Sequence, residues 1–142
     1  MKELIDKLPI DIVLKIIPYT YKLQNKQLLN DIVSYVETKT LLLDVYYNYW
    51  TIEMQEPYPE EYKYWLINDI ISYANNYNAT MYGYIDKFYN IFMRNNFLHS
   101  KKAVRQYLKK FDDKDVTTQI NIFLSLLNNE ERKELIKIRP NE

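Results

Sequence analysis

Asp31 and Asp69 are the two residues whose type and setting come nearest to those of a catalytic pair. Each occurs in the motif Asn-Asp-Ile, and the second copy follows the first after 38 residues. Two carboxylates brought together can divide acid and base roles between them. Each aspartate is also followed four residues later by a tyrosine, Tyr35 or Tyr73, within reach of a helix-surface contact. This simpler structural role is the one we expect.

The rest of the sequence offers no other catalytic or metal-binding set. It contains a single histidine, His99, and no cysteine, so paired-histidine and thiolate metal sites are excluded. Its single glycine, Gly83, cannot form a glycine-rich phosphate-binding loop. We therefore expect no enzyme, no catalytic residues, no metal site and no bound cofactor. His99 is expected in a loop or at a helix start.

Two clusters of aromatic residues could form a binding surface. One contains Tyr46, Tyr47, Tyr49 and Trp50, and the other contains Tyr58, Tyr62, Tyr64 and Trp65. Tyrosine and tryptophan supply large, stiff contact areas with a polar group, which favours protein interfaces, and nucleic-acid bases can also stack on them. Half-buried packing in the core is the third alternative. The candidate interface residues are Tyr47, Trp50, Tyr62 and Trp65.

A basic stripe is predicted on one helix near the C-terminal end. Lys101, Arg105 and Lys109 recur at intervals of four residues, and Lys102 and Lys110 extend the patch. Such a stripe could contact phosphates or an acidic partner, or it could be the solvated face of an amphipathic helix. The formal net charge is +0, with Lys+Arg and Asp+Glu both at 19. Nucleic acid is therefore an unfavoured partner, since proteins that coat it usually carry a positive excess.

The elements that position these residues are all predicted to be helices. Apolar residues recur at helical spacing along the chain, no alternating strand pattern competes with them, and 142 residues suit one domain. We predict an all-α domain of about eight helices over residues 1–142. Ser100, Asp112 or Asp113, and Asn128 with Glu131 are the predicted N-terminal caps of the last three helices.

An internal duplication organises the predicted fold. Leu28–Tyr35 is echoed by Leu66–Tyr73, and Asp44–Trp50 is echoed less closely by Asp86–Phe92. A period near 40 residues is typical of duplicated helical pairs, here at about 28–54 and 65–95. Each pair has two predicted helices; the second helices cover about Thr38–Met54 and Ala79–Arg94, with Gly83 packed closely against another helix.

The duplication also predicts which positions are buried. The shared apolar positions, which should form an inward face in both copies, are Leu29, Ile32 and Val33 and their counterparts Ile67, Ile70 and Ile71. Leu28 and Val36 extend that face in the first copy. If the duplication is structural, Asp31 and Asp69 should occupy equivalent positions.

The segment that begins Leu8-Pro9-Ile10-Asp11 and continues to Tyr19 resembles the opening of an F-box, which starts with Leu-Pro, an acidic residue and an amphipathic helix. Leu28, Leu29 and the aromatic group ending at Trp50 could serve as its later hydrophobic positions, so the resemblance covers residues 7–50. It implies docking on a Skp-type adaptor of a ubiquitin ligase through an apolar surface formed by Leu8, Pro9, Val13 and Ile17.

Composition and the N-terminal residues bear on origin and location. Ile, Asn, Lys and Tyr, whose codons are AT-rich, are abundant, and Tyr alone contributes 15 residues. In this respect the chain resembles small helical proteins encoded by giant viruses of protists. Met1–Tyr21 lacks the uninterrupted apolar core of a secretory signal, and no run approaches the roughly 18 apolar residues of a membrane span. We expect a soluble intracellular protein, in the host cytoplasm or a virion.

These features together favour a non-catalytic module that binds another protein, either through the aromatic clusters or as an F-box-like adaptor. A small structural component of a virion or another assembly is the first alternative, and a weak nucleic-acid-binding protein is the second. The oligomeric state is left open by the sequence.

Overall fold

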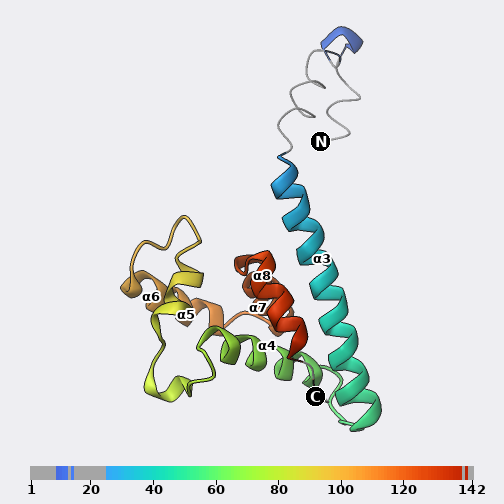
Figure 1. The fold of residues 1–142 in the computed structure, drawn as a ribbon, viewed down its shortest axis with the longest axis vertical. Helices are drawn as coiled ribbons and strands as arrows, with labels where there is room; N and C mark the ends of the chain where they lie inside the picture. The colour runs from blue at the N-terminus through green and yellow to red at the C-terminus, as the bar shows by residue number, and fades with distance from the viewer. Residues whose placement is uncertain (1–8, 13, 15–24, 139, 141–142) are drawn as a thin grey trace. The chain divides into compact units, whose positions relative to one another are not determined.

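The structure is a computed structural model that describes residues 9–12, 14, 25–138 and 140, and it is helical without strands over these residues. The all-α prediction is therefore confirmed. The elements, in chain order, are α3 (Lys26–Tyr46), the π-helix η1 (Tyr47–Glu53), α4 (Glu61–Ala74), the 3₁₀ turn η2 (Thr80–Tyr82), α5 (Asp86–Phe92), α6 (Lys101–Asp112), α7 (Val116–Leu126) and α8 (Asn129–Lys137) (Figure 1). Over the described ranges, no helix is both long and apolar enough to cross a membrane.

The chain divides into two compact units, residues 1–33 and 34–142, and the boundary falls inside α3. The prediction that residues 1–142 form one domain stays a prediction. In the first unit, Ile10–Ile12 and Leu14 are helical, and the Ile12 amide donates to the Pro9 carbonyl at 3.0 Å. Pro9 is thus at the start of a helical turn, where its missing N–H costs nothing.

The core of the second unit is built mainly from aromatic side chains. Phe92 lies at its centre, with ring centroids 5.0 Å from Phe88, 5.1 Å from Phe123 and 5.8 Å from Phe111. All four rings are buried, and most of these pairs have the edge-to-face or tilted geometry that aromatic quadrupoles prefer. Because these rings come from α5, α6 and α7, they join three helices in one cluster.

Side-chain caps set the starts of the last three helices. Ser100 accepts a hydrogen bond from the Ala103 amide, and Asn128 forms a capping box with Glu131, so both predictions are confirmed. The third cap is Asp115 rather than Asp112 or Asp113, because α6 continues through Asp112. The hydrogen bonds of Asp115 with the Thr118 hydroxyl and amide lower the pKa of its carboxyl.

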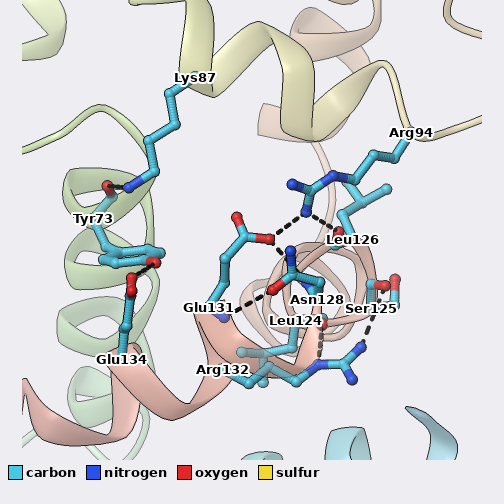
Figure 2. Close-up of polar contacts among 10 residues, drawn as sticks. All are labelled: Tyr73, Lys87, Arg94, Leu124, Ser125, Leu126, Asn128, Glu131, Arg132 and Glu134. Carbon is cyan, nitrogen blue, oxygen red and sulfur yellow. Dashed lines mark hydrogen bonds and ion pairs between the residues drawn. The ribbon is translucent and has the colours of Figure 1, made fainter.

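Two arginines satisfy the carbonyls at the end of α7, where the last turn has no intrahelical donors. The Arg94 guanidinium donates to the Leu126 carbonyl at 2.9 Å and pairs with Glu131 of α8 (Figure 2). Arg132, which is fully buried, donates through Nε to the Leu124 carbonyl at 3.0 Å and through Nη2 to the Ser125 carbonyl at 3.5 Å. The positive charges of both arginines also interact favourably with the negative C-terminal end of the α7 dipole.

The two copies of the duplicated sequence have different structures. The first is not a helical pair, because α3 is one uninterrupted helix from Lys26 to Tyr46 and continues into η1 (Figure 1). The second is divided: α4 ends at Ala74, a loop follows, and α5 begins at Asp86. The second copy has Asn75-Asn76-Tyr77-Asn78 between its helices, whereas the first has no such turn-forming run.

Burial also differs between the copies. Ile32 is 48% exposed, whereas its counterpart Ile70 is 0% exposed. Leu28, Leu29, Val33 and Val36 are likewise exposed, so the predicted inward face of the first copy is wrong. In the second copy Ile67 and Ile70 are buried in the core and Ile71 packs against it, as predicted.

The predicted helix over Ala79–Arg94 is confirmed only for α5 (Asp86–Phe92), and Thr80–Tyr82 forms a separate 3₁₀ turn. Gly83 lies outside any helix with a φ of +97°, and nothing lies within 4 Å of the position that a Cβ would occupy. This glycine is required for its backbone conformation and not for close packing. It ends the 3₁₀ turn and directs the chain back toward α5.

Asn75 holds the loop between α4 and α5 in one conformation. Its buried side chain donates to the Asn78 carbonyl at 2.9 Å and to the Gly83 carbonyl at 3.3 Å, and it accepts from the Ile85 amide at 2.9 Å. One amide group therefore satisfies three backbone groups of the loop. Sequence alone gave no signal for this role of Asn75.

Asn75→Ala is expected to lower the free energy of unfolding by about 1–3 kcal/mol, because buried backbone groups lose their partners. Urea unfolding measures this loss, and amide hydrogen exchange in residues 76–85 is expected to accelerate. The matched control is Asn78→Ala, which removes an exposed side chain from the same loop. Equal effects of the two substitutions on stability and exchange would contradict the role given to Asn75.

Candidate interaction surface

The two aromatic clusters come together where η1 packs against α4. The Trp50 and Trp65 rings are stacked, with centroids 4.2 Å apart and planes within 5° of parallel. Beside them, Tyr47 and Tyr62 meet edge to face at 5.4 Å. We call these four residues the aromatic platform. The sequence placed its members in separate clusters, and the structure joins them in two pairs across the two helices.

Part of the aromatic platform faces solvent. Tyr47 is 42% exposed and Trp65 is 39% exposed, while Trp50 and Tyr62 are half-buried and pack against the core. Aromatic residues of the core, by contrast, are almost completely covered. Trp50 and Tyr62 therefore fix the platform to the core, while Tyr47 and Trp65 provide an accessible outer surface, as at the centre of many protein interfaces.

The π-helix η1 presents Trp50 to α4. It directly continues α3, and π-helical segments are rare and frequently occur at functional sites. The indole Nε1 of Trp50 and the hydroxyl of Thr51 are buried, and neither has a hydrogen-bond partner within the described part of the chain. Burying unpaired donors is unfavourable, so packing of the surrounding rings has to offset this cost.

Tyr46 belongs to the core and not to the platform. Its hydroxyl donates to Oδ2 of Asp69 at 2.5 Å. Burial, reinforced by the Asp69 carboxylate, raises the pKa of this hydroxyl well above its ordinary value. The contact fixes the end of α3 on α4, immediately before the platform begins.

The expected pairing of Asp69 with Tyr73 is wrong. Tyr73 instead donates its hydroxyl to Glu134 of α8, while Lys87 donates to the Tyr73 carbonyl at 3.2 Å (Figure 2). Burial and the Glu134 carboxylate raise the pKa of the Tyr73 hydroxyl. Tyr35, the corresponding residue of the first copy, lies against Arg132. The Asp69 carboxylate thus has a structural role in joining α3 to α4.

The remaining candidates for chemistry lie apart from any built site. His99 is exposed just before the cap Ser100, in a loop as expected. Among the residues that the structure describes, no three histidine, cysteine or acidic residues are grouped so that they could hold a metal ion.

The basic patch follows the solvated face of α6. Lys101 pairs with Asp86 at 2.6 Å, and this contact lowers the pKa of the Asp86 carboxyl. The other members, Lys102, Arg105, Lys109 and Lys110, are all exposed. On the opposite face, Val104, Leu108 and Phe111 are buried and Tyr107 is half-buried, so α6 is an amphipathic helix.

Of the F-box-like surface, only Pro9 falls within the described residues, and it is exposed. Leu8, Val13 and Ile17 lie outside them. Comparison with protein-family models, with curated proteins and with solved structures finds no match for this chain.

Proposed function

We propose that this chain is a non-catalytic protein-interaction module whose aromatic platform binds a partner protein. The observation that carries the proposal is the stacked Trp50–Trp65 pair, in which one ring is anchored against the core and the other is 39% exposed. Tryptophan and tyrosine are enriched among residues that dominate binding energy. A rigid stacked pair loses little side-chain freedom on binding, which favours affinity.

The residues around the platform indicate the charge of the partner. Glu53, Glu56, Glu60 and Glu61 lie in the chain between Trp50 and Tyr62. Lys63, whose ammonium lies 5.9 Å from the centre of the Tyr62 ring, pairs with Glu60 at 3.1 Å and leaves the other three carboxylates as a net negative charge. This acidic surrounding disfavours nucleic acid, whose phosphates would be repelled. It suits a protein surface that presents arginine or lysine, because these cations pair with carboxylates and also stack on exposed aromatic faces.

Affinity capture from cells that naturally express the chain, followed by quantitative mass spectrometry, tests the proposal. We expect Trp65→Ala to reduce recovery of the partner at least about tenfold, as for a residue central to an interface. The matched control is Tyr64→Ala, which removes the adjacent exposed aromatic residue of α4 and should leave recovery unchanged. Circular dichroism establishes that both variants remain folded.

Several outcomes separate the proposed function from its alternatives. Equal recovery of every partner by wild type and Trp65→Ala contradicts the role of the platform. Recovery of a Skp-type adaptor would identify the partner expected from the F-box resemblance. High copy number in purified particles would instead favour the structural alternative.

A further inference from the structure

A shallow open surface, which we call the groove, lies on one face of α3 within the second unit. It has a volume of about 570 Å³, and its described lining residues all belong to α3: Val36, Glu37, Thr40, Leu41 and Asp44. Its apolar wall is accessible, since Val36 is 52% exposed. The sequence pattern had placed Val36 inward, so this surface was not foreseen.

Two carboxylates mark the ends of the groove. Glu37 and Asp44 are seven residues apart on α3, so they lie on one face, separated by about 10 Å along the helix axis. Both are exposed, and neither forms an ion pair with another residue in the described ranges. The groove therefore combines an apolar centre with two uncompensated negative charges.

The basic face of α6 has the matching arrangement. Lys102 and Lys109 are also seven residues apart on one helix, with the same separation of about 10 Å. Both are exposed and make no ion pair within the part of the chain that the structure describes. Arg105 lies between them and adds a third positive charge. The spacing and sign of these charges complement those of the groove.

We propose that the groove on α3 receives α6 of a second copy of this chain, with Lys102 and Lys109 facing Glu37 and Asp44. The aliphatic stems of the lysines would cover Val36 and Leu41 while their ammonium groups reach the carboxylates. A formal net charge of +0 removes the long-range repulsion that keeps many proteins apart.

The groove and the basic face are different surfaces, so each copy offers one of each. Two copies that exchange both contacts form a twofold dimer, and copies joined by single contacts form a closed ring or an open chain. The inference goes beyond the proposed function and uses no residue of the aromatic platform. Self-association and partner binding can therefore be tested independently.

Sedimentation velocity over a range of concentrations up to about 1 mM at low ionic strength tests this inference. The wild type is expected to self-associate, and added salt should weaken the association. Two charge-reversal variants, Glu37→Lys with Asp44→Lys and Lys102→Glu with Lys109→Glu, should each lose at least about tenfold in association constant. An equimolar mixture should recover it, because each variant then meets a surface of opposite charge.

The control is Asp11→Lys with Glu130→Lys, which makes the same charge change as the groove variant at exposed residues outside the groove. It should keep the association of the wild type. A wild type that is monomeric throughout, a groove variant no weaker than the control, or a mixture that stays monomeric would each overturn the inference.

Discussion

Replacing Phe92 by alanine is expected to lower the free energy of unfolding by about 3–5 kcal/mol, the range found for large-to-small substitutions of buried phenylalanine. The Phe92 ring is 0% exposed and contacts aromatic residues of α5, α6 and α7. Its removal leaves a cavity at the point where the three helices meet, and the rings around it cannot all move inward. Urea unfolding followed by circular dichroism measures the change.

Phe97 provides a control of the same residue type five positions away. It is 87% exposed, so Phe97→Ala should change the free energy of unfolding by no more than about 0.5 kcal/mol. Comparable losses for the two substitutions would mean that the aromatic cluster is not the centre of the core. Phe92→Leu, which is expected to cost less, supplies the measurement if Phe92→Ala has no folded baseline.

Arg132→Met is expected to lower the free energy of unfolding by about 2–4 kcal/mol. Methionine keeps much of the volume and the apolar stem but removes the donors to the Leu124 and Ser125 carbonyls. Buried carbonyls without partners are costly, at about 1–3 kcal/mol each. The loss is measured by urea unfolding. Arg132→Lys keeps the charge but not the planar fork, so its stability should be intermediate.

Lys133 is the neighbouring control for this prediction. It is exposed on α8, and its only ion pair among the described residues is with Glu130 at 3.4 Å. Surface pairs of this kind contribute little, so Lys133→Met should have an effect below about 0.5 kcal/mol. A loss at Arg132 no greater than at Lys133 would show that the α7 carbonyls do not depend on the arginine.

Sequence reasoning was most successful where structure is decided locally. The helical class follows from apolar spacing, and the caps Ser100 and Asn128 follow from contacts within three residues of each helix start. The stripe of basic residues on one face of α6 was also predicted correctly, because residues four positions apart lie on the same side of a helix. None of these conclusions requires knowledge of distant parts of the chain.

Reasoning from the internal repeat failed because similar residues can have different neighbours. Ile32 and Ile70 occupy the same place in the repeated pattern, yet α4 packs against α7 whereas the corresponding face of α3 is exposed. Periodicity identifies which residues share a face, but not whether another element covers that face. The exposed groove at Val36 and Leu41 was missed for the same reason.

The aromatic platform was only partly foreseeable. The sequence identified all four residues as candidate interface residues. The stacking of Trp50 on Trp65, however, depends on the π-helix η1, and no sequence pattern predicted a π-helix at this position. The hydrogen bonds that hold the loop after α4 were missed for a related reason: the side chain of Asn75 forms its contacts up to ten residues further along the chain.

The π-helix also determines how this protein can tolerate changes in length. Each residue of an α-helix turns the chain by about 100°, so removing Asn48 or Tyr49, which lie between α3 and Trp50, would rotate Trp50 relative to α3 by roughly that angle. Trp50 and Trp65 would then cease to stack even though both remained in the chain. During evolution this segment should therefore tolerate substitutions better than insertions or deletions. Gaps between related sequences are expected elsewhere, such as in the loop that precedes α5.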